Sequence, residues 1–355
     1  MTINDQQIFL MEEFKIPFLD PFCPGDWKDW YHYILYNPVT KARLLYNLCF
    51  NGKPGSGYVA DTLFLTLPKG FVQHHVSDAA LMETYGFARN IKWEENDLMT
   101  DPLKYYKDEI AFSVYDKLTC INVSNISSGI AINISGKPVA TPVYLPELAP
   151  YGNGFMGWGV IPGFQMEGDI LIGNKKIIVD KNWYCYHDRN FGRFNWGNIG
   201  WTWFVLNAID GKGKEWTYIL HRSNNKDYSK KGAPLLFVYR ENKLKKIFLG
   251  ATIDIQLRWE KTDNIPPILP GAMASVFSDR SIFMPKQIIV IARDEKDNVF
   301  IKMDINTQSE LIVSDNETKQ YTFLKELSGQ ASSKHLFNNI KTICREGFFY
   351  AELVH

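Results

Sequence analysis

WTWFVLNAIDGKGKEWTYILH, residues 201–221, is the stretch that decides the fold. Two apolar runs rich in aromatic and β-branched residues, 201–209 and 215–221, flank a polar, Gly-containing turn at 210–214. Runs of this kind joined by a short turn predict an antiparallel β-hairpin. The pattern recurs at 169–179, 235–249 and 287–303. The chain therefore predicts a meander of antiparallel strands, without alternation of strand and helix.

Helical signals are few and short. The clearest are 77–85, with Ser77 or Asp78 as a candidate N-cap, and 334–343. Prolines recur through 138–163, and each would interrupt a strand ladder, so we expect a long irregular connection there. Aromatic residues within it, Trp158 among them, favour an ordered loop that lines a site.

Length and composition narrow the class of protein. A chain of 355 residues exceeds what one core usually organises, so we expect two domains. Basic and acidic residues balance at 39 each, which argues against nucleic acid or an anionic membrane as partner. Aromatic residues reach 14%, which suits a cavity for a hydrophobic small-molecule substrate. Strand propensity alone would account for many of these aromatics.

Several other classes lack their signals. Five scattered cysteines without a Cys-x-x-Cys pair indicate neither a disulfide framework nor a zinc site. His74 and His75 are adjacent and would point to opposite faces of a strand, so we expect no metal. Nucleotide-binding glycine motifs are missing, so we expect no cofactor. Residues 1–7 carry no secretory signal and no apolar run is long enough for an integral membrane segment, so we expect a cytoplasmic protein.

The clearest functional signal is a run of ionisable residues beside several tryptophans, Tyr186-His187-Asp188-Arg189-Asn190-Phe191-Gly192 followed by Trp196, Trp201 and Trp203. In an extended strand Tyr186 and Asp188 share one face, whereas His187 and Arg189 share the other. We therefore expect Tyr186 and Asp188 in one pocket. The alternative interpretation is a polar corner at a strand end, with the tryptophans in the core.

This run resembles the Tyr-His-Asp-His-Asn-Trp-Gly motif of the carotenoid 1,2-hydratase/AttH-like family, lipocalin-type proteins related to cyclases of the Diels-Alderase kind. Arg189 stands in place of the second His, and Phe191 in place of the Trp. Three further stretches resemble family motifs in the same order, namely WKDWY at 27–31, Trp158 with GFQMEG at 163–168, and EGFFYAEL at 346–353. Together the four stretches cover nearly the whole chain.

The resemblance implies an all-β fold class, with two lipocalin-like antiparallel β-barrel or sandwich domains and few short helices. It places an N-terminal lipocalin-like domain at 1–197 and a C-terminal lipocalin-like barrel at 198–355. Glu167 and Glu352 lie in strands that resemble those of the family, and we expect both to be structural.

The resemblance also implies acid-initiated hydration of an isolated terpenoid alkene through a tertiary cation. Asp188 is the implied proton donor, and Tyr186 would hold that proton or position water. Burial among indoles must raise the pKa of Asp188, while a nearby guanidinium would lower it. The implied substrate contacts are Trp158, Trp196, Trp201, Trp203, Arg189 and Asn190. Because these residues come from both domains, we expect an aromatic pocket at the domain junction.

Three functions remain open from the sequence. The first is a cofactor-independent enzyme that hydrates or cyclises an isoprenoid or polyene-type molecule with acid assistance. The second is a Diels-Alderase-like pericyclase of a polyketide-type product, in which shape matters more than a strong acid. The third is a non-catalytic lipocalin-type carrier of an apolar ligand. Substrate identity and oligomeric state cannot be inferred from these residues.

Overall fold

The computed structural model describes residues 25–68, 82–100, 103–115, 118–144, 149–151, 154–194, 199–225, 229–262, 282–315 and 320–354. The chain divides into two compact units, Met1–Phe194 and Asn195–His355. The sequence-based prediction puts this boundary at residue 197. Within the described ranges both units are built from antiparallel strands, and the helical elements there are two short 3-10 turns, η3 (Glu95–Asp97) and η5 (Gly250–Thr252). The predicted all-β fold is confirmed.

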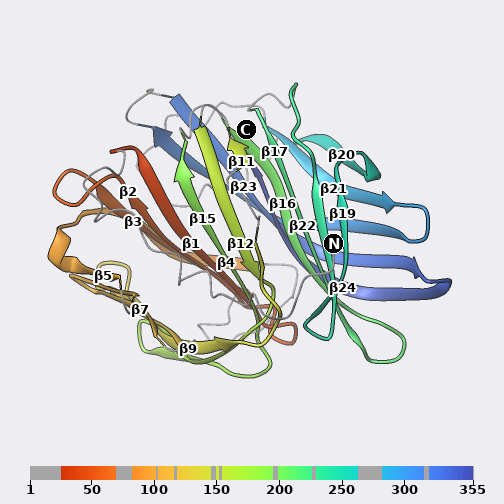
Figure 1. Ribbon diagram of the computed structural model, residues 1–355. Helices are drawn as coiled ribbons and strands as arrows, with labels where there is room; N and C mark the ends of the chain where they lie inside the picture. The colour runs from red at the N-terminus through yellow and green to blue at the C-terminus, as the bar shows by residue number, and fades with distance from the viewer. Residues whose placement is uncertain are drawn as a thin grey trace. The chain divides into compact units, whose positions relative to one another are not determined.

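Two sheets form the N-terminal unit, and Figure 1 shows them as separate layers. Sheet A contains, in spatial order, β10 (Val143–Tyr144), β12 (Gly154–Ile161), β15 (Tyr184–Arg193), β1 (Trp27–Tyr36), β2 (Arg43–Asn51), β3 (Tyr58–Pro68) and β4 (Met82–Lys92), with β11 (Ala149–Tyr151) also paired to β12. Sheet B contains β14 (Lys175–Val179), β13 (Phe164–Ile172), β9 (Ile130–Pro138), β8 (Leu118–Asn125), β7 (Ile110–Tyr115), β6 (Leu103–Lys107) and β5 (Leu98–Thr100).

The hydrophobic core of this unit lies between the two sheets. Aromatic rings from opposite sheets meet there, with centroids 5.2 Å apart for Tyr31 and Phe112 and 5.1 Å apart for Phe50 and Tyr105. Strands of sheet B alternate buried with more exposed positions, so one of its faces is open to solvent. Strands β1 and β15 differ, because nearly every position on both of their faces is buried. Side chains on both faces of these two strands are therefore shielded from water.

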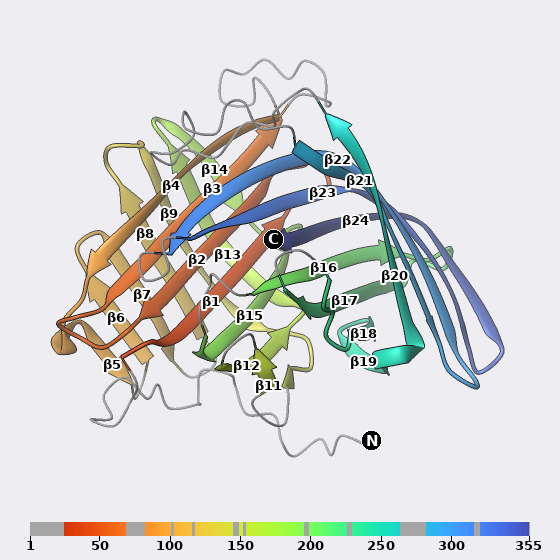
Figure 2. The ribbon, with the colours of Figure 1, turned by 90° about the horizontal axis from the view of Figure 1, so that it is seen from above.

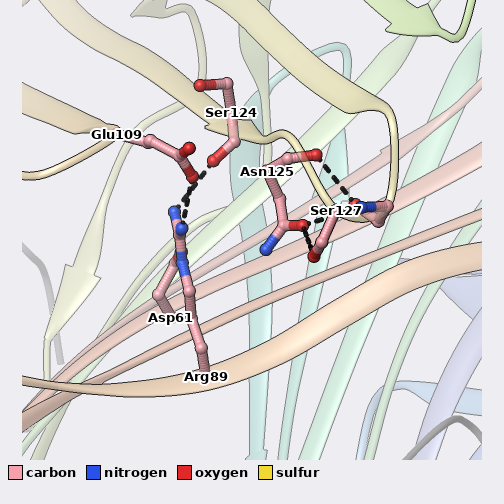
Figure 3. Close-up of polar contacts among 7 residues, drawn as sticks. Asp61, Arg89, Glu109, Ser124, Asn125 and Ser127 are labelled. Atoms are coloured by element: carbon pink, nitrogen blue, oxygen red, sulfur yellow. Dashed lines mark hydrogen bonds and ion pairs between the residues drawn. The ribbon is translucent and has the colours of Figure 1, made fainter.

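An arginine joins sheet A to sheet B (Figure 3). The guanidinium of Arg89 on β4 donates from Nε to Asp61 Oδ2 on β3 at 2.8 Å. It also donates to Glu109 Oε2 at 2.7 Å and to the backbone oxygen of Ser124 on β8 at 3.0 Å. The Asp61 side chain is fully buried. Burial raises its pKa to about 6 although Arg89 acts in the opposite direction.

A single sheet forms the C-terminal unit. Sheet C contains, in spatial order, β19 (Lys243–Leu249), β18 (Leu235–Arg240), β17 (Glu215–Asn224), β16 (Gly200–Ile209), β24 (Ile340–Val354), β23 (Gln320–Phe337), β22 (Asn298–Asp315), β21 (Ile282–Arg293) and β20 (Ile253–Thr262). Figure 2 shows several of these strands side by side. The predicted hairpins at 201–221, 235–249 and 287–303 are the pairs β16–β17, β18–β19 and β21–β22.

Sheet C curls around its own core as a half-barrel. Contacts across the concave face join strands that are not neighbours in the sheet. Tyr218 on β17 has its hydroxyl 3.1 Å from His335 Nδ1 on β23, and the rings of Phe248 and Phe337 are 6.5 Å apart. The two outermost strands, β19 and β20, are joined by the three residues of η5.

Both helix predictions are wrong where the structure describes them. The segment 334–343 forms the β23–β24 hairpin, turning at Asn338 and Asn339, whose φ angles are 49° and 65°. Two consecutive residues with positive φ match the twist of paired strands, and Asn tolerates that conformation. Residues 82–85 belong to β4, and the rest of 77–85 lies outside the described residues, as do His74 and His75.

The predicted irregular connection at 138–163 is also wrong in part, because β12 lies within it. The prolines there that the structure describes lie where they break no ladder. Pro138 ends β9, Pro150 lies in the short outer strand β11, and Pro162 follows the end of β12. The intervening residues 154–161 are therefore free to pair along β15.

Candidate active site

Four of the predicted site residues lie on two neighbouring strands of sheet A. Tyr186, Asp188 and Asn190 occupy alternate positions of β15, and Trp158 on β12 pairs directly with Asn190. Antiparallel pairing brings the side chains of such residues within contact distance. Their shared face is the one turned away from sheet B, because His187 and Arg189 at the intervening positions point into the core side.

Three neutral groups hold the carboxyl group of Asp188. The hydroxyl of Tyr186 donates to Oδ2 at 2.7 Å, and the indole nitrogen of Trp158 donates to the same oxygen at 3.1 Å. The amide of Asn190 donates to Oδ1 at 3.0 Å. Oδ2 therefore has both acceptor sites occupied, whereas Oδ1 retains one. When Asp188 is protonated, Oδ1 is the oxygen that can carry the proton.

Burial tunes this carboxyl group toward acid chemistry. Asp188 is 5% exposed, and burial raises its pKa to about 6. The hydrogen bonds from Tyr186, Trp158 and Asn190 oppose that rise, because each favours the charged form. Among the described residues, no lysine or arginine forms an ion pair with Asp188. Asp188 thus combines burial with a raised pKa, the two properties that a general acid near neutral pH needs.

Arg189 lies on the opposite face of β15, away from Asp188. Its guanidinium forms a two-pronged ion pair with Asp29 on β1, donating from Nε at 2.8 Å and from Nη2 at 2.6 Å. Both side chains are almost completely buried. The rings of Tyr31 and Phe191 lie 5.1 and 5.2 Å from the guanidinium carbon. Arg189 therefore lies on the opposite face from Trp158 and Asn190, and Asp29 neutralises its charge.

Strand β1 adds residues that sequence reasoning missed. His32 pairs directly with Asp188 across the β1–β15 ladder and is 2% exposed. Its ring centroid lies 6.5 Å from that of Tyr186 and 5.6 Å from that of Trp30. Trp30 donates its indole hydrogen to Asn47 Oδ1 on β2 at 2.7 Å. A local signal was present, since His32 directly follows the WKDWY motif, but only the nonlocal strand pairing places it beside Asp188.

The remaining predicted contacts belong to the other unit or cannot be described. Trp201 and Trp203 lie on β16 and are both buried, on the face opposite the core residues Phe204 and Leu206. The indole nitrogen of Trp201 donates to Glu352 Oε2 on β24 at 3.0 Å. Trp196 lies outside the described residues. The convergence of these tryptophans with Asp188 stays a prediction.

A surface hollow of about 720 Å³ lies elsewhere, on the solvent-exposed face of sheet B. Polar residues including Gln165, Glu167 and Asp180 line it, and none of the residues around Asp188 does. A buried acid with aromatic neighbours is a stronger indicator of chemistry than an open polar depression, so we place the candidate site at Asp188. In the described part of the chain, no group of three or more His, Cys, Asp or Glu is placed to hold a metal ion. No helix there is long and apolar enough to cross a membrane.

Comparisons with known proteins bear on this geometry. No protein-family model matches the chain, and no curated protein matches it. Solved structures do match. Kievitone hydratase from Nectria haematococca is 11% identical, with a TM-score of 0.62 and coverage of 100% of this chain and 96% of that one. An AttH-like protein from Nitrosomonas europaea is 13% identical, with a TM-score of 0.60 and coverage of 99% and 98%.

The chain has the fold of these proteins. A third structure, CghA solved with Sch210972, is 11% identical and has a TM-score of 0.57, with coverage of 93% of this chain and 88% of that one. The resemblance noticed in the sequence motifs is thereby confirmed as a likeness of fold over the whole chain.

Proposed function

We propose that this protein is a cofactor-independent enzyme that adds water to, or cyclises, a hydrophobic alkene-bearing small molecule, with Asp188 as the general acid. The observation that carries the proposal is a buried carboxyl group held only by neutral donors. With a pKa of about 6, such a group keeps a protonated fraction near neutral pH that can give its proton to a substrate. An isoprenoid or polyene is the substrate class that such an acid and its aromatic surroundings would suit.

The acid step requires a proton and an environment that tolerates positive charge. Oδ1 of Asp188 gives its proton to one alkene carbon, and the positive charge develops at the other. Trp158 and Trp30 lie on the two strands that flank β15, each directly opposite Asn190, and aromatic faces attract cations by roughly 2 kcal/mol when water is excluded. Proton transfer leaves a negative charge on Asp188. That charge is stabilised by Tyr186, Trp158 and Asn190, which already donate hydrogen bonds to the carboxyl group.

Two outcomes of the cation are chemically available. Attack by water gives an alcohol, and the structural likeness to kievitone hydratase favours this reaction. Attack by a second alkene gives a ring. A pericyclase without an acid step is the second candidate, and the likeness to CghA, which was solved with the small molecule Sch210972, supports it. A carrier would bind an apolar ligand and leave it unchanged.

The test uses farnesol, geranylgeraniol and a linear polyene in water labelled with oxygen-18, with products followed by mass spectrometry. Hydration gives a labelled alcohol, whereas cyclisation gives an unlabelled isomer. Asp188→Asn should lower turnover by on the order of 10²-fold or more while the quenching of tryptophan fluorescence by substrate persists. Asp61→Asn is the matched control, because it makes the same change in another buried carboxyl group of the same unit.

Each result is decisive for one assignment. Normal turnover by Asp188→Asn would show that the acid assignment is wrong and would favour a pericyclase. Binding by the wild-type protein without any product would favour a carrier. Equal losses in Asp188→Asn and Asp61→Asn would indicate a general loss of folding rather than of acid catalysis.

A further inference from the structure

His32 is the residue of the site whose role the proposed acid step leaves open. It lies on β1 directly opposite Asp188, so the two side chains project from the same face of sheet A. On its other side it pairs with Asn47 of β2. The three residues thus form one row across strands β15, β1 and β2. The rings of Trp30 and Tyr186 border His32 within this face.

The charge state of His32 follows from its surroundings. Burial, and secondarily the nearby His187, lowers the pKa of His32 to about 3. The imidazole is therefore neutral at physiological pH, and one of its ring nitrogens can accept a proton. His187 lies behind it on the core side, where its Nδ1 is 3.0 Å from the backbone oxygen of His32. That contact ties the strand of the acid to the strand of His32.

We propose that His32 is the base that accepts a proton from the water molecule attacking the substrate cation, and that it then returns this proton to Asp188. The proposal rests on the proposed function, because it concerns the hydration branch of the same reaction. It is carried by the placement of a buried imidazole directly across the ladder from the acid. In this proposal the acid lies on β15 and the base lies on the neighbouring strand β1.

The step balances in atoms and charge. Asp188 transfers a proton to carbon, which breaks the π bond, forms a C–H bond and leaves a carboxylate. The oxygen of water bonds to the cationic carbon, and one water proton passes to the ring of His32. The imidazolium then transfers that proton to the carboxylate of Asp188. The net change is addition of one water molecule across the double bond, and both side chains return to their starting states.

The direction of proton flow agrees with the environment of each group. A newly formed protonated alcohol is far more acidic than an imidazolium, so it loses its proton to His32. The low pKa of His32 and the pKa of about 6 at Asp188 make the onward transfer to the carboxylate downhill. Without an acceptor at this place, the cation is left to lose a proton elsewhere or to close a ring. His32 therefore decides whether the product is an alcohol.

The experiment compares wild-type protein, His32→Gln and Asp188→Asn with farnesol and geranylgeraniol in deuterium oxide. His32→Gln should make the alcohol on the order of 10²-fold more slowly, while deuterium still enters the alkene carbon and elimination or ring products rise. Asp188→Asn should lose both deuterium entry and alcohol. Because only Asp188→Asn tests the acid step, failure of the His32 proposal and failure of the proposed function give different patterns.

Two further measurements separate a chemical role from a structural one. Imidazole added to His32→Gly should restore part of the alcohol formation, and it should do nothing for a protein that has merely lost packing. His335→Gln is the matched control, since His335 is another fully buried histidine, in the C-terminal unit. It should leave the ratio of alcohol to ring products unchanged.

A third readout needs no substrate. In spectra of nitrogen-15 histidine, with His32 assigned by its absence in His32→Gln, its ring should stay neutral down to pH 5. Wild-type rates of alcohol formation in a folded His32→Gln protein would overturn the proposal. An imidazole at this position that titrates between pH 6 and 7 would overturn it as well, because such a group would hold the proton that Asp188 must receive.

Discussion

Asp188 and Asp61 are two buried carboxyl groups in the same unit, and burial raises the pKa of each to about 6. Their partners differ. Asp61 pairs with the cation Arg89, which ties two sheets together, whereas Asp188 accepts hydrogen bonds from Trp158, Tyr186 and Asn190. Protonating Asp61 removes the negative charge that balances Arg89. The three groups that donate to Asp188 are neutral, so protonating Asp188 breaks no ion pair with them. A carboxyl group that can gain and lose a proton at little structural cost is the one suited to acid catalysis.

The largest effect expected from this comparison concerns the buried cation on the other face of β15. Arg189→Leu leaves the fully buried Asp29 without its partner, so it should lower the free energy of unfolding by about 3–5 kcal/mol. Urea unfolding monitored by tryptophan fluorescence measures the change. Arg193→Leu is the control, because the pair of Arg193 with Asp26 is largely exposed and its loss should scarcely matter. Similar losses in the two variants would contradict the assignment of Arg189 as a structural ion pair.

The next effect is on the pH dependence of stability. Because the pKa of Asp188 is raised in the folded state, the folded protein binds that proton more tightly than the unfolded chain does. This stabilisation is fully present below about pH 4 and is lost as the pH rises through 6, by on the order of 3 kcal/mol. Asp188→Asn should therefore lose less stability than wild type between pH 4 and pH 7 in urea titrations. Parallel pH profiles for the two proteins would contradict the raised pKa.

The protonation state of Asp188 should also set the pH dependence of catalysis. The acid is active only when protonated, so kcat/KM should fall roughly tenfold per pH unit above about pH 6. Initial rates of alcohol formation between pH 5 and pH 8 test this. Asp61→Asn should keep the same alkaline limb, because Asp61 lies in the Arg89 cluster and not in the site. A rate that is flat across this range would indicate a reaction without general acid catalysis.

The smallest effect sharpens the role of the neutral donors. Tyr186→Phe removes the shortest hydrogen bond to Asp188, at 2.7 Å, which stabilises the carboxylate. The pKa of Asp188 should rise, moving the alkaline limb of kcat/KM upward by about one pH unit. Trp158→Phe should move it less, because that bond is 3.1 Å long. A downward shift in either variant would mean that these groups favour the protonated form.

Local sequence patterns predicted what depends on neighbours along the chain. Alternation along 184–193 was sufficient to place Tyr186 with Asp188 and Arg189 on the opposite face. Hairpins with polar turns were equally clear. The failures at 138–163 and 334–343 arose because prolines at strand ends and an Asn-Asn turn were interpreted without knowledge of the strands that they border.

Those local patterns could not predict which strands pair when they are far apart in the sequence. His32 meets Asp188, and Asp29 meets Arg189, only because β1 pairs with β15. Asp29 and Arg189 lie in two of the four motif-like stretches, and their buried ion pair joins these stretches although they are far apart in the sequence. A single sequence carries no record of such a pairing, since each residue taken alone fits many neighbours.

The pairing of β1 with β15 also has a consequence for how the protein is made. Asp29 leaves the ribosome long before Arg189, its partner 160 positions later. Until β15 arrives, one edge of β1 is unpaired, and long-range pairing of this kind folds slowly. A nascent chain that ends before residue 184 carries the Asp29 carboxylate without the arginine that neutralises it. The strand that carries Asp188 is the last strand of the N-terminal unit, so the candidate site and the folded unit should form together.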